Sequence, residues 1–126
     1  MIFISHRGNV NEINIHLENT QNYIDKAIEL GYEVEIDLWK IDEDLFLGHD
    51  RPERLVKLDW LEERKQKLWI HTKNRNAFES FTLLNSNFKF FWHTLEPYVF
   101  TSNGVIWAHD YKNIQNEHLC IVPLLS

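Results

Sequence analysis

Short apolar runs that end in histidine recur five times along this chain of 126 residues. Runs of this kind, rich in β-branched and aromatic residues, are typical of buried strands. A histidine at the end of each would place imidazoles along one rim of a sheet or barrel, where the carboxyl ends of parallel strands carry the chemistry. We therefore expect an active rim. The five runs are residues 2–6, 45–49, 68–71, 90–93 and 105–109.

Strand and helix patterns alternate before residue 92, and only strand patterns follow. We expect strands at 2–5, 32–39, 68–71 and 88–92, helices at 20–30, 59–67 and 74–84, a hairpin across 39–47, and later strands at 98–101, 105–107 and 119–122. Such alternation predicts a parallel sheet with crossover helices. A complete (β/α)8 barrel needs about 250 residues. We therefore predict an α/β fold in one domain, 1–126: a reduced or incomplete TIM-type barrel of about seven strands, with outer helices lost in the C-terminal half.

Composition and charge exclude several classes of protein. The chain is 44% hydrophobic and has a net charge of −6, with no basic run, so we expect no nucleic-acid partner. Its single cysteine, Cys120, lies in an apolar run and is expected to be a small buried hydrophobe. No signal peptide is visible, and no segment approaches the roughly 18 apolar residues of a membrane span. We expect a cytoplasmic protein without a transmembrane segment.

Three carboxylates share one face of the strand expected at 32–39. Glu33, Glu35 and Asp37 alternate with apolar residues, and no lysine interrupts them. One interpretation is a solvated edge strand. The strand lies between two helical patterns, however, which predicts burial on both sides, and buried carboxylates need cations or a bound metal. A metal site is the favoured interpretation.

Further residues suited to phosphoryl chemistry are expected at the same rim as these carboxylates. His6 is followed by Arg7, whose planar fork suits phosphate oxygens, and by Gly8, which allows close backbone approach. Lys73 offers a second cation. One imidazole could act as base and another as acid, while a metal neutralises phosphate charge.

Four short motifs occur in the order and spacing of the glycerophosphodiester phosphodiesterases, members of the phospholipase-C-like barrel phosphodiesterases. The resemblance covers residues 1 to about 75, a little over half of the chain. Together the four motifs make it strong, although each alone is weak. The motifs are His6-Arg7-Gly8, Glu18-Asn19-Thr20, Glu35-Ile36-Asp37 and Gly48-His49-Asp50.

The resemblance implies a role for each matching residue. His6 and His49 would be the catalytic pair, Glu35 and Asp37 would bind one divalent cation (Mg, Ca, Mn or Zn), and Arg7 would bind phosphate. Supporting positions are Glu18 and Asn19. The family mechanism implies attack of a substrate hydroxyl on phosphorus, a cyclic phosphate and its hydrolysis, and therefore a small-molecule phosphodiester substrate and a place in lipid metabolism.

The chain departs from the family pattern at the end of the strand at 68–71. A glutamate that completes the metal shell is expected there, but the segment reads His71-Thr72-Lys73, which keeps only the lysine. Imidazole is a poor ligand for calcium or magnesium and suits zinc, manganese, iron or nickel better. Three alternatives follow: a softer metal bound by His71, an ion held by the two carboxylates and water, or a charged His71 in place of the metal. We favour a bound metal.

The other histidines and the short length of the chain give further expectations. His93 could contact substrate or be a hydrogen-bonded rim residue, whereas His109 is expected to be structural and His16 and His118 to lie on the surface. The chain is about half the length usual in the family. An incomplete barrel exposes edge strands, which dimerisation into a homo-oligomer or curling of the remaining strands could cover.

The sequence thus predicts a metal-dependent phosphoric diester hydrolase acting on glycerophosphodiester-like or lysophospholipid-like substrates. The alternative is an inactive phosphate-binding or metabolite-binding pseudoenzyme of the same fold, and His71 favours it. A third, weaker hypothesis is a lyase that releases the cyclic phosphate as its final product.

Overall fold

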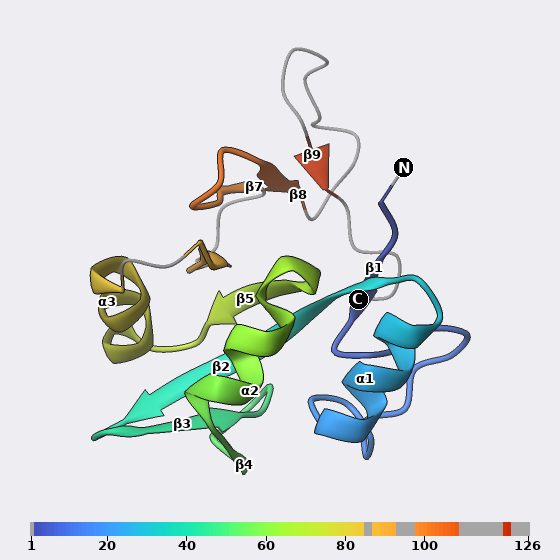
Figure 1. Cartoon of the computed structure of the whole chain (residues 1–126), viewed down its shortest axis with the longest axis horizontal. Helices are drawn as coiled ribbons and strands as arrows, with labels where there is room; N and C mark the ends of the chain where they lie inside the picture. The colour runs from blue at the N-terminus through green and yellow to red at the C-terminus, as the bar shows by residue number, and fades with distance from the viewer. Residues whose placement is uncertain (1, 85–86, 93–97, 109–119, 122–126) are drawn as a thin grey trace.

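The computed structural model describes residues 2–84, 87–92, 98–108 and 120–121. The described residues include three α-helices and two β-sheets (Figure 1). The helical elements are α1 (Gln21–Glu29), α2 (Leu58–Arg64), the 3₁₀ turn η1 (Lys65–Lys67) and α3 (Arg75–Leu83). The strands are β1 (Ile4–His6), β2 (Glu33–Ile41), β3 (Asp44–Leu47), β4 (Arg54–Val56), β5 (Leu68–Thr72), β6 (Lys89–Phe91), β7 (Tyr98–Phe100), β8 (Ile106–Ala108) and β9 (Cys120–Ile121).

The larger sheet is built around β2. Strands β4, β3, β2, β5 and β6 follow one another across it, and β1 also pairs with β2. The pairs β1–β2, β2–β5 and β5–β6 are parallel, whereas β2–β3 and β3–β4 are antiparallel. Strand β1 pairs with the first part of β2, at Glu33 to Glu35, and β3 pairs with its last part, at Leu38 to Ile41. The smaller sheet has the order β7–β8–β9.

The reduced-barrel prediction is wrong, because this sheet is open and mixed in strand direction. A barrel needs successive parallel strands that pair around a closed ring. Here the chain turns back after β2, and β3 and β4 add antiparallel strands at one end of the sheet. Strands β7 and β8 form an antiparallel pair in a separate sheet, so they do not continue the parallel order. The outer helices that alternate with strands in a barrel are limited to α1, α2 and α3 within the described residues.

Side-chain caps begin helices α1 and α3, whereas α2 has no side-chain cap. The hydroxyl of Thr20 accepts a hydrogen bond from the backbone N–H of Tyr23, and Asn74 caps α3 in the same way through Ala77. Gly31, with φ of +96°, follows the end of α1, where the left-handed conformation favours glycine.

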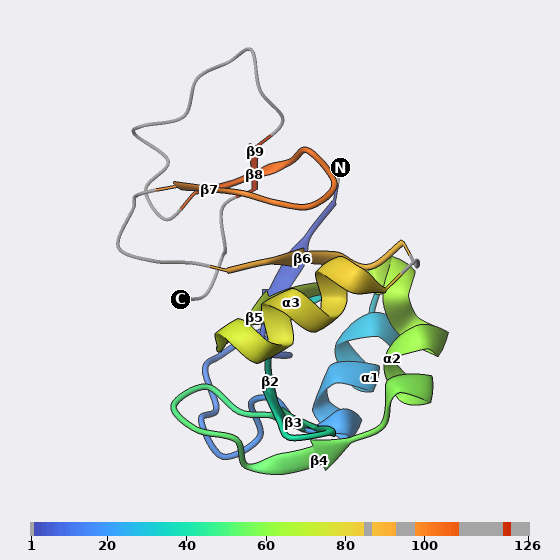
Figure 2. The same cartoon turned by 90° about the vertical axis from the view of Figure 1, so that its left-hand side faces the viewer.

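The three helices lie on one face of the sheet and enclose the main core (Figure 2). Residues from every layer meet there, including Ile24 of α1, Ile36 of β2, Ile70 of β5 and Phe81 of α3. Because side chains alternate along a strand, the neighbours of these residues point to the opposite face. That face carries a small apolar cluster and the polar residues of the candidate site. The cluster consists of Ile4, Trp69, Phe91 and Val105.

The turn between β7 and β8 is fastened to β6 across this second face. The backbone N–H of Ser102 donates to Phe90 O at 3.0 Å, and the Ser102 hydroxyl accepts from the Phe90 N–H at 2.9 Å. Val105 then packs with Trp69 and Phe91.

In the part of the chain that the structure describes, none of the helices has the length and apolar character needed to cross a membrane.

Candidate functional site

Strand β2 carries Glu35 and Asp37 on the face that the helices leave uncovered. Glu35 lies opposite His6 of β1 in the parallel register, and Asp37 lies opposite His71 of β5. The neighbouring strands β1, β2 and β5 therefore bring two imidazoles and two carboxylates together, as the strand-ending pattern predicts. His6 ends β1, whereas His71 is the residue before the last in β5.

Glu35 is buried between the two imidazoles. Its side chain is 2% exposed, Oε2 lies 2.8 Å from His6 Nε2, and Oε1 lies 3.8 Å from His71 Nδ1. In the part of the chain that the structure describes, these two imidazoles are the cationic partners of the carboxylate. A buried carboxylate held only by such contacts needs further positive charge to offset its lost hydration.

Asp37 is equally buried but has more partners. Its Oδ2 lies 3.0 Å from Arg7 Nε and accepts a hydrogen bond of 3.0 Å from Asn19 Nδ2, while Oδ1 lies 3.2 Å from His71 Nδ1. The Asn19 carbonyl in turn accepts the Asp37 backbone N–H at 2.9 Å. Burial alone would raise the pKa of Asp37, but His71, Asn19 and Arg7 together hold it well below its usual range. Asp37 is therefore an anion over the whole physiological range of pH.

His6 responds to the same carboxylates. Burial lowers the pKa of its imidazole and nearby Arg7 opposes protonation, but the charge and hydrogen-bonding of Glu35 outweigh both and raise the pKa above the ordinary 6.5. A histidine with its proton held near neutral pH can donate that proton to a leaving group.

Glu35, Asp37 and His71 have the geometry of a metal site. One ligand atom from each residue lies within 4.8 Å of the other two. Glu35 Oε1 and Asp37 Oδ1 are both buried and face the same nitrogen, His71 Nδ1, at 3.8 and 3.2 Å, so a cation bound by that nitrogen would lie next to both oxygens. Two carboxylates and an imidazole are a donor set that proteins use for divalent ions. The residues present therefore fit the metal that the sequence predicts.

The loop between β1 and α1 supplies two residues that contact Asp37, Arg7 and Asn19. Arg7 and Asn19 both have left-handed backbone, with φ of 59° and 57°, and the Asn19 N–H donates to Arg7 O at 3.1 Å. Arg7 also lies 3.3 Å from Glu18 through its terminal nitrogen. The guanidinium predicted to bind phosphate is thus already held between Asp37 and Glu18, with 16% of its side chain exposed.

Asn9 is a supporting residue that the sequence analysis missed. Its Nδ2 donates to Glu18 Oε2 at 2.7 Å, and its Oδ1 accepts both the Asn14 N–H and the Tyr23 hydroxyl. The available signal was an asparagine directly after His6-Arg7-Gly8, in a loop rich in residues that bond to backbone.

His49 stands apart from the buried network, on a cavity of about 430 Å³ that it shares with Arg7. The backbone ties Gly48 to β2, because the Gly48 N–H donates to Asp37 O at 3.2 Å and Trp39 Nε1 donates to Gly48 O at 2.7 Å. The His49 side chain is 42% exposed, and Nδ1 lies 2.9 Å from Asp50 Oδ1. The remaining lining residues are Ile15, His16, Glu18, Asn19, Gly48, Asp50, Arg51, Glu53 and Arg54.

Of the other predicted site residues, Lys73 is described and His93 is not. Lys73 follows β5, and its backbone N–H donates to Leu38 O at 2.8 Å. Within the described residues no carboxylate lies at ion-pair distance from its ammonium. His93, His109 and His118 fall outside the described residues, so their predicted roles stay predictions.

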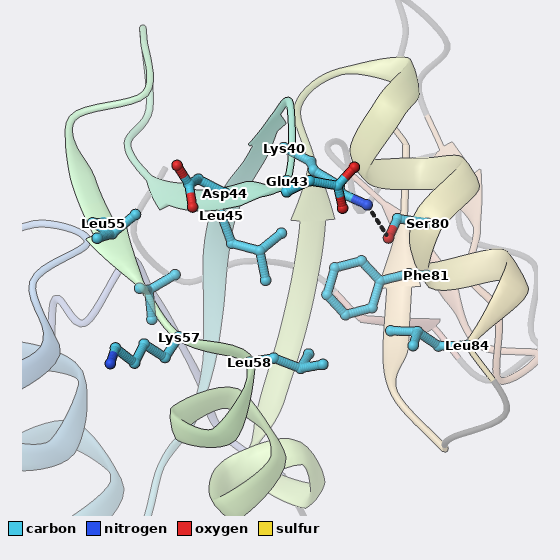
Figure 3. Close-up of a pocket in the computed structure, with 11 residues that line it drawn as sticks. Lys40, Glu43, Asp44, Leu45, Leu55, Lys57, Leu58, Ser80, Phe81 and Leu84 are labelled. Atoms are coloured by element: carbon cyan, nitrogen blue, oxygen red, sulfur yellow. Dashed lines mark hydrogen bonds between the residues drawn. The ribbon is translucent and has the colours of Figure 1, made fainter.

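A second cavity, of about 440 Å³, lies on the helix side of the sheet between β4, the start of α2 and α3 (Figure 3). Leucines and Phe81 line much of it, and Lys40 Nζ donates to Ser80 Oγ at 3.1 Å across its rim. It contains none of the predicted site residues. Glu35 and Asp37 lie on the opposite face of β2, because they alternate with the core residues Ile36 and Leu38.

Substituting Gly48 tests whether the turn that carries His49 is fixed by close packing. A Cβ at this position would lie 2.0 Å from Arg51 O and 3.1 Å from Glu53 N, so Gly48→Ala must displace the turn. We expect a loss of about 1–3 kcal/mol in the free energy of unfolding, as for other overpacked positions, together with weaker catalysis. Urea denaturation measures the first effect.

Gly31→Ala is the matched control, because a Cβ at Gly31 meets nothing within 4 Å. Its positive φ costs about 1 kcal/mol of backbone strain, and any activity should be unchanged. A Gly48→Ala protein as stable and active as the unsubstituted chain would show that the turn is loosely held.

Comparison with known proteins adds no relative: no family model, curated protein or solved structure matches this chain.

Proposed function

We propose that this chain is a phosphodiester hydrolase that acts on small glycerophosphodiester-like or lysophospholipid-like substrates with one divalent metal ion. The observation that carries the proposal is the single buried network formed by His6, Arg7, Glu35, Asp37 and His71 on neighbouring strands. Arg7 extends from this network to the cavity that His49 lines. Two imidazoles, a guanidinium and a metal-compatible cluster are the groups that phosphoryl transfer requires.

In this mechanism His6 and His49 handle the protons. A substrate hydroxyl next to the phosphodiester attacks phosphorus and gives its proton to one imidazole, while the other imidazole protonates the departing oxygen. A new P–O bond forms as the bond to the departing alcohol breaks, which leaves a cyclic phosphate. Water then opens the ring, with the two imidazoles exchanging roles, to give a phosphomonoester.

The remaining residues bind and orient the phosphate. Glu35, Asp37 and His71 would hold the metal, which when bound supplies positive charge that neutralises the phosphate oxygens. Arg7 offers planar N–H donors at the cavity wall. Lys73, directly after the strand of His71, adds a second cation.

Release of choline tests the proposal. We expect glycerophosphocholine or lysophosphatidylcholine to be hydrolysed by metal-loaded protein, and the activity to vanish with a chelator and return when metal is restored. Calorimetric binding of either compound without turnover by folded, metal-loaded protein would contradict the proposal and favour the inactive phosphate-binding alternative. A cyclic phosphate as the final product would favour the lyase.

Ile15 supports the lipid part of the substrate assignment. Its side chain lines the cavity beside His49 and Arg54 and is 70% exposed, so it offers apolar surface to an acyl chain next to the cations. We expect Ile15→Ser to raise KM for lysophosphatidylcholine by up to about tenfold, corresponding to partial burial of one aliphatic side chain. The KM for glycerophosphocholine should not change.

Ile13→Ser is the matched control for Ile15. Ile13 belongs to the same loop and is 52% exposed, but it does not line the cavity. Equal effects of the two substitutions, or equal effects on both substrates, would remove Ile15 as an acyl-chain contact.

A further inference from the structure

We infer that Glu35, Asp37 and His71 form a site for a zinc-class transition ion in preference to magnesium or calcium, and that His71 sets this preference. The inference rests on the metal site in the proposed function and adds the class of ion. Its basis is the set of donors that reach the site and the way in which neighbouring residues limit that set.

The carboxylate oxygens at the site are few. Glu33, the third acidic residue on this face of β2, is engaged elsewhere, because its Oε1 accepts Trp69 Nε1 at 2.8 Å and Lys89 Nζ at 2.7 Å. Asp37 Oδ2 is also occupied, by Arg7 and Asn19. Glu35 Oε2 faces His6 Nε2 at 2.8 Å, so the two carboxylate oxygens that remain are Glu35 Oε1 and Asp37 Oδ1. Calcium takes six to eight oxygen ligands, so this face of the sheet is poorly suited to it.

The nitrogen donor is held in place by stacking. The His71 ring lies against the Phe91 ring, with centroids 5.0 Å apart and planes inclined by 17°. In this orientation Nδ1 lies 3.2 Å from Asp37 Oδ1 and 3.8 Å from Glu35 Oε1. The imidazole thus takes part in the same small cluster as the two carboxylates.

Three protein ligands of this kind match what zinc requires. Catalytic zinc sites use three nitrogen, oxygen or sulfur ligands and keep one position open, whereas magnesium strongly prefers oxygen and retains its waters. Imidazole is a ligand that suits zinc, copper, iron and nickel, whereas carboxylate, carbonyl and water oxygens suit magnesium and calcium. One nitrogen among three ligands therefore discriminates against the hard ions.

Direct binding to the metal-free full chain tests the inference without any reference to activity. We expect calorimetric titration to give one Zn²⁺ per chain, bound at least about tenfold more tightly than Mg²⁺ or Ca²⁺, the lower end of the effects that metal-site residues have on affinity. His71→Glu should weaken zinc and strengthen magnesium or calcium. Cobalt(II) added as a spectroscopic probe should show visible absorption bands that shift in His71→Glu.

Three further variants separate the site from adventitious binding and from misfolding. Glu33→Gln removes a carboxylate from the same face of the same strand and should leave zinc affinity unchanged, whereas Glu35→Gln should abolish tight binding. His71→Gln, close to the natural side chain in size, should weaken zinc without a gain in magnesium. Circular dichroism checks that each variant is folded.

The outcomes distinguish this inference from the proposed function. Magnesium or calcium bound as tightly as zinc, unchanged zinc affinity in folded His71→Glu, or no ion bound by folded protein would overturn the inference. Phosphodiester turnover supported by magnesium alone would overturn it too, while leaving the proposed function intact. Selective zinc binding without turnover would support the inference and contradict the proposed function.

Discussion

We expect replacement of either His6 or His49 with alanine to lower kcat/KM for phosphodiester hydrolysis by about 10²–10⁴-fold, the usual contribution of a positioned acid or base. In the proposed mechanism the two imidazoles handle different protons, because His6 of β1 is held by Glu35 whereas His49 lies on the cavity wall. Initial rates with choline release as the readout measure the effect. The double variant should be little slower than the slower single variant, because the two groups act as one unit.

Two control measurements show whether lost activity comes from the missing imidazole or from a loss of the fold or the metal. The His49 side chain is 42% exposed and outside the metal cluster, so His49→Ala should keep both the fold and the zinc affinity of the natural chain. Fluorescence-monitored urea denaturation and calorimetry test these points. A folded, metal-binding His49→Ala protein that retains more than about a tenth of the activity would rule out His49 as an acid or base.

The second large effect is on stability and comes from Asp37. We expect Asp37→Asn to lower the free energy of unfolding of the metal-free protein by about 3 kcal/mol, because breaking a buried ion pair leaves charged partners uncompensated. The amide has the same shape but no charge to offer Arg7 and His71, which lie 3.0 and 3.2 Å from the carboxylate oxygens. Urea denaturation in the presence of a chelator measures the difference.

The difference should depend on pH in one direction. The pKa of Asp37 is lowered in the folded state relative to the ordinary 3.8, so its carboxylate stabilises the fold above that ordinary value. The stabilisation is lost as pH falls from about 4 towards the lower folded pKa. The natural chain and Asp37→Asn should therefore converge in stability as the solution is acidified and differ fully at neutral pH.

Asp25→Asn provides the matched control. Asp25 also pairs with an arginine, Arg64, but its side chain is 35% exposed, so its removal should cost about 1 kcal/mol or less. Equal stability losses for the two substitutions, or no loss for Asp37→Asn at neutral pH, would show that the Asp37 network contributes little.

Local patterns predicted the parts of the fold that depend on neighbouring residues. Thr20 and Asn74 cap helices at the expected places, and the acidic turn after Ile41 forms a hairpin between β2 and β3. Closure into a barrel depends instead on which distant strands pair, and hydrophobic periodicity carries no such information. Strand β4, which pairs antiparallel with β3, was not predicted.

In the candidate site, too, local spacing was predictable and contacts between distant residues were not. The spacing of Glu35 and Asp37 along one strand, and the ends of the strands bearing His6 and His71, were enough to predict that these residues share a face. The partners of individual side chains were not predictable. Glu33 has the same sequence pattern as Glu35 but bonds to Trp69 and Lys89, because its neighbours across the sheet differ.

We propose that this network and His49 together hydrolyse a phosphodiester. Phosphorus NMR of metal-loaded, folded protein mixed with glycerophosphocholine or lysophosphatidylcholine tests this activity most directly. We expect the diester resonance of at least one compound to decline while that of a phosphomonoester grows, and His6→Ala to prevent the change. Unchanged diester resonances for both compounds, in protein shown by calorimetry to hold its metal, would contradict it.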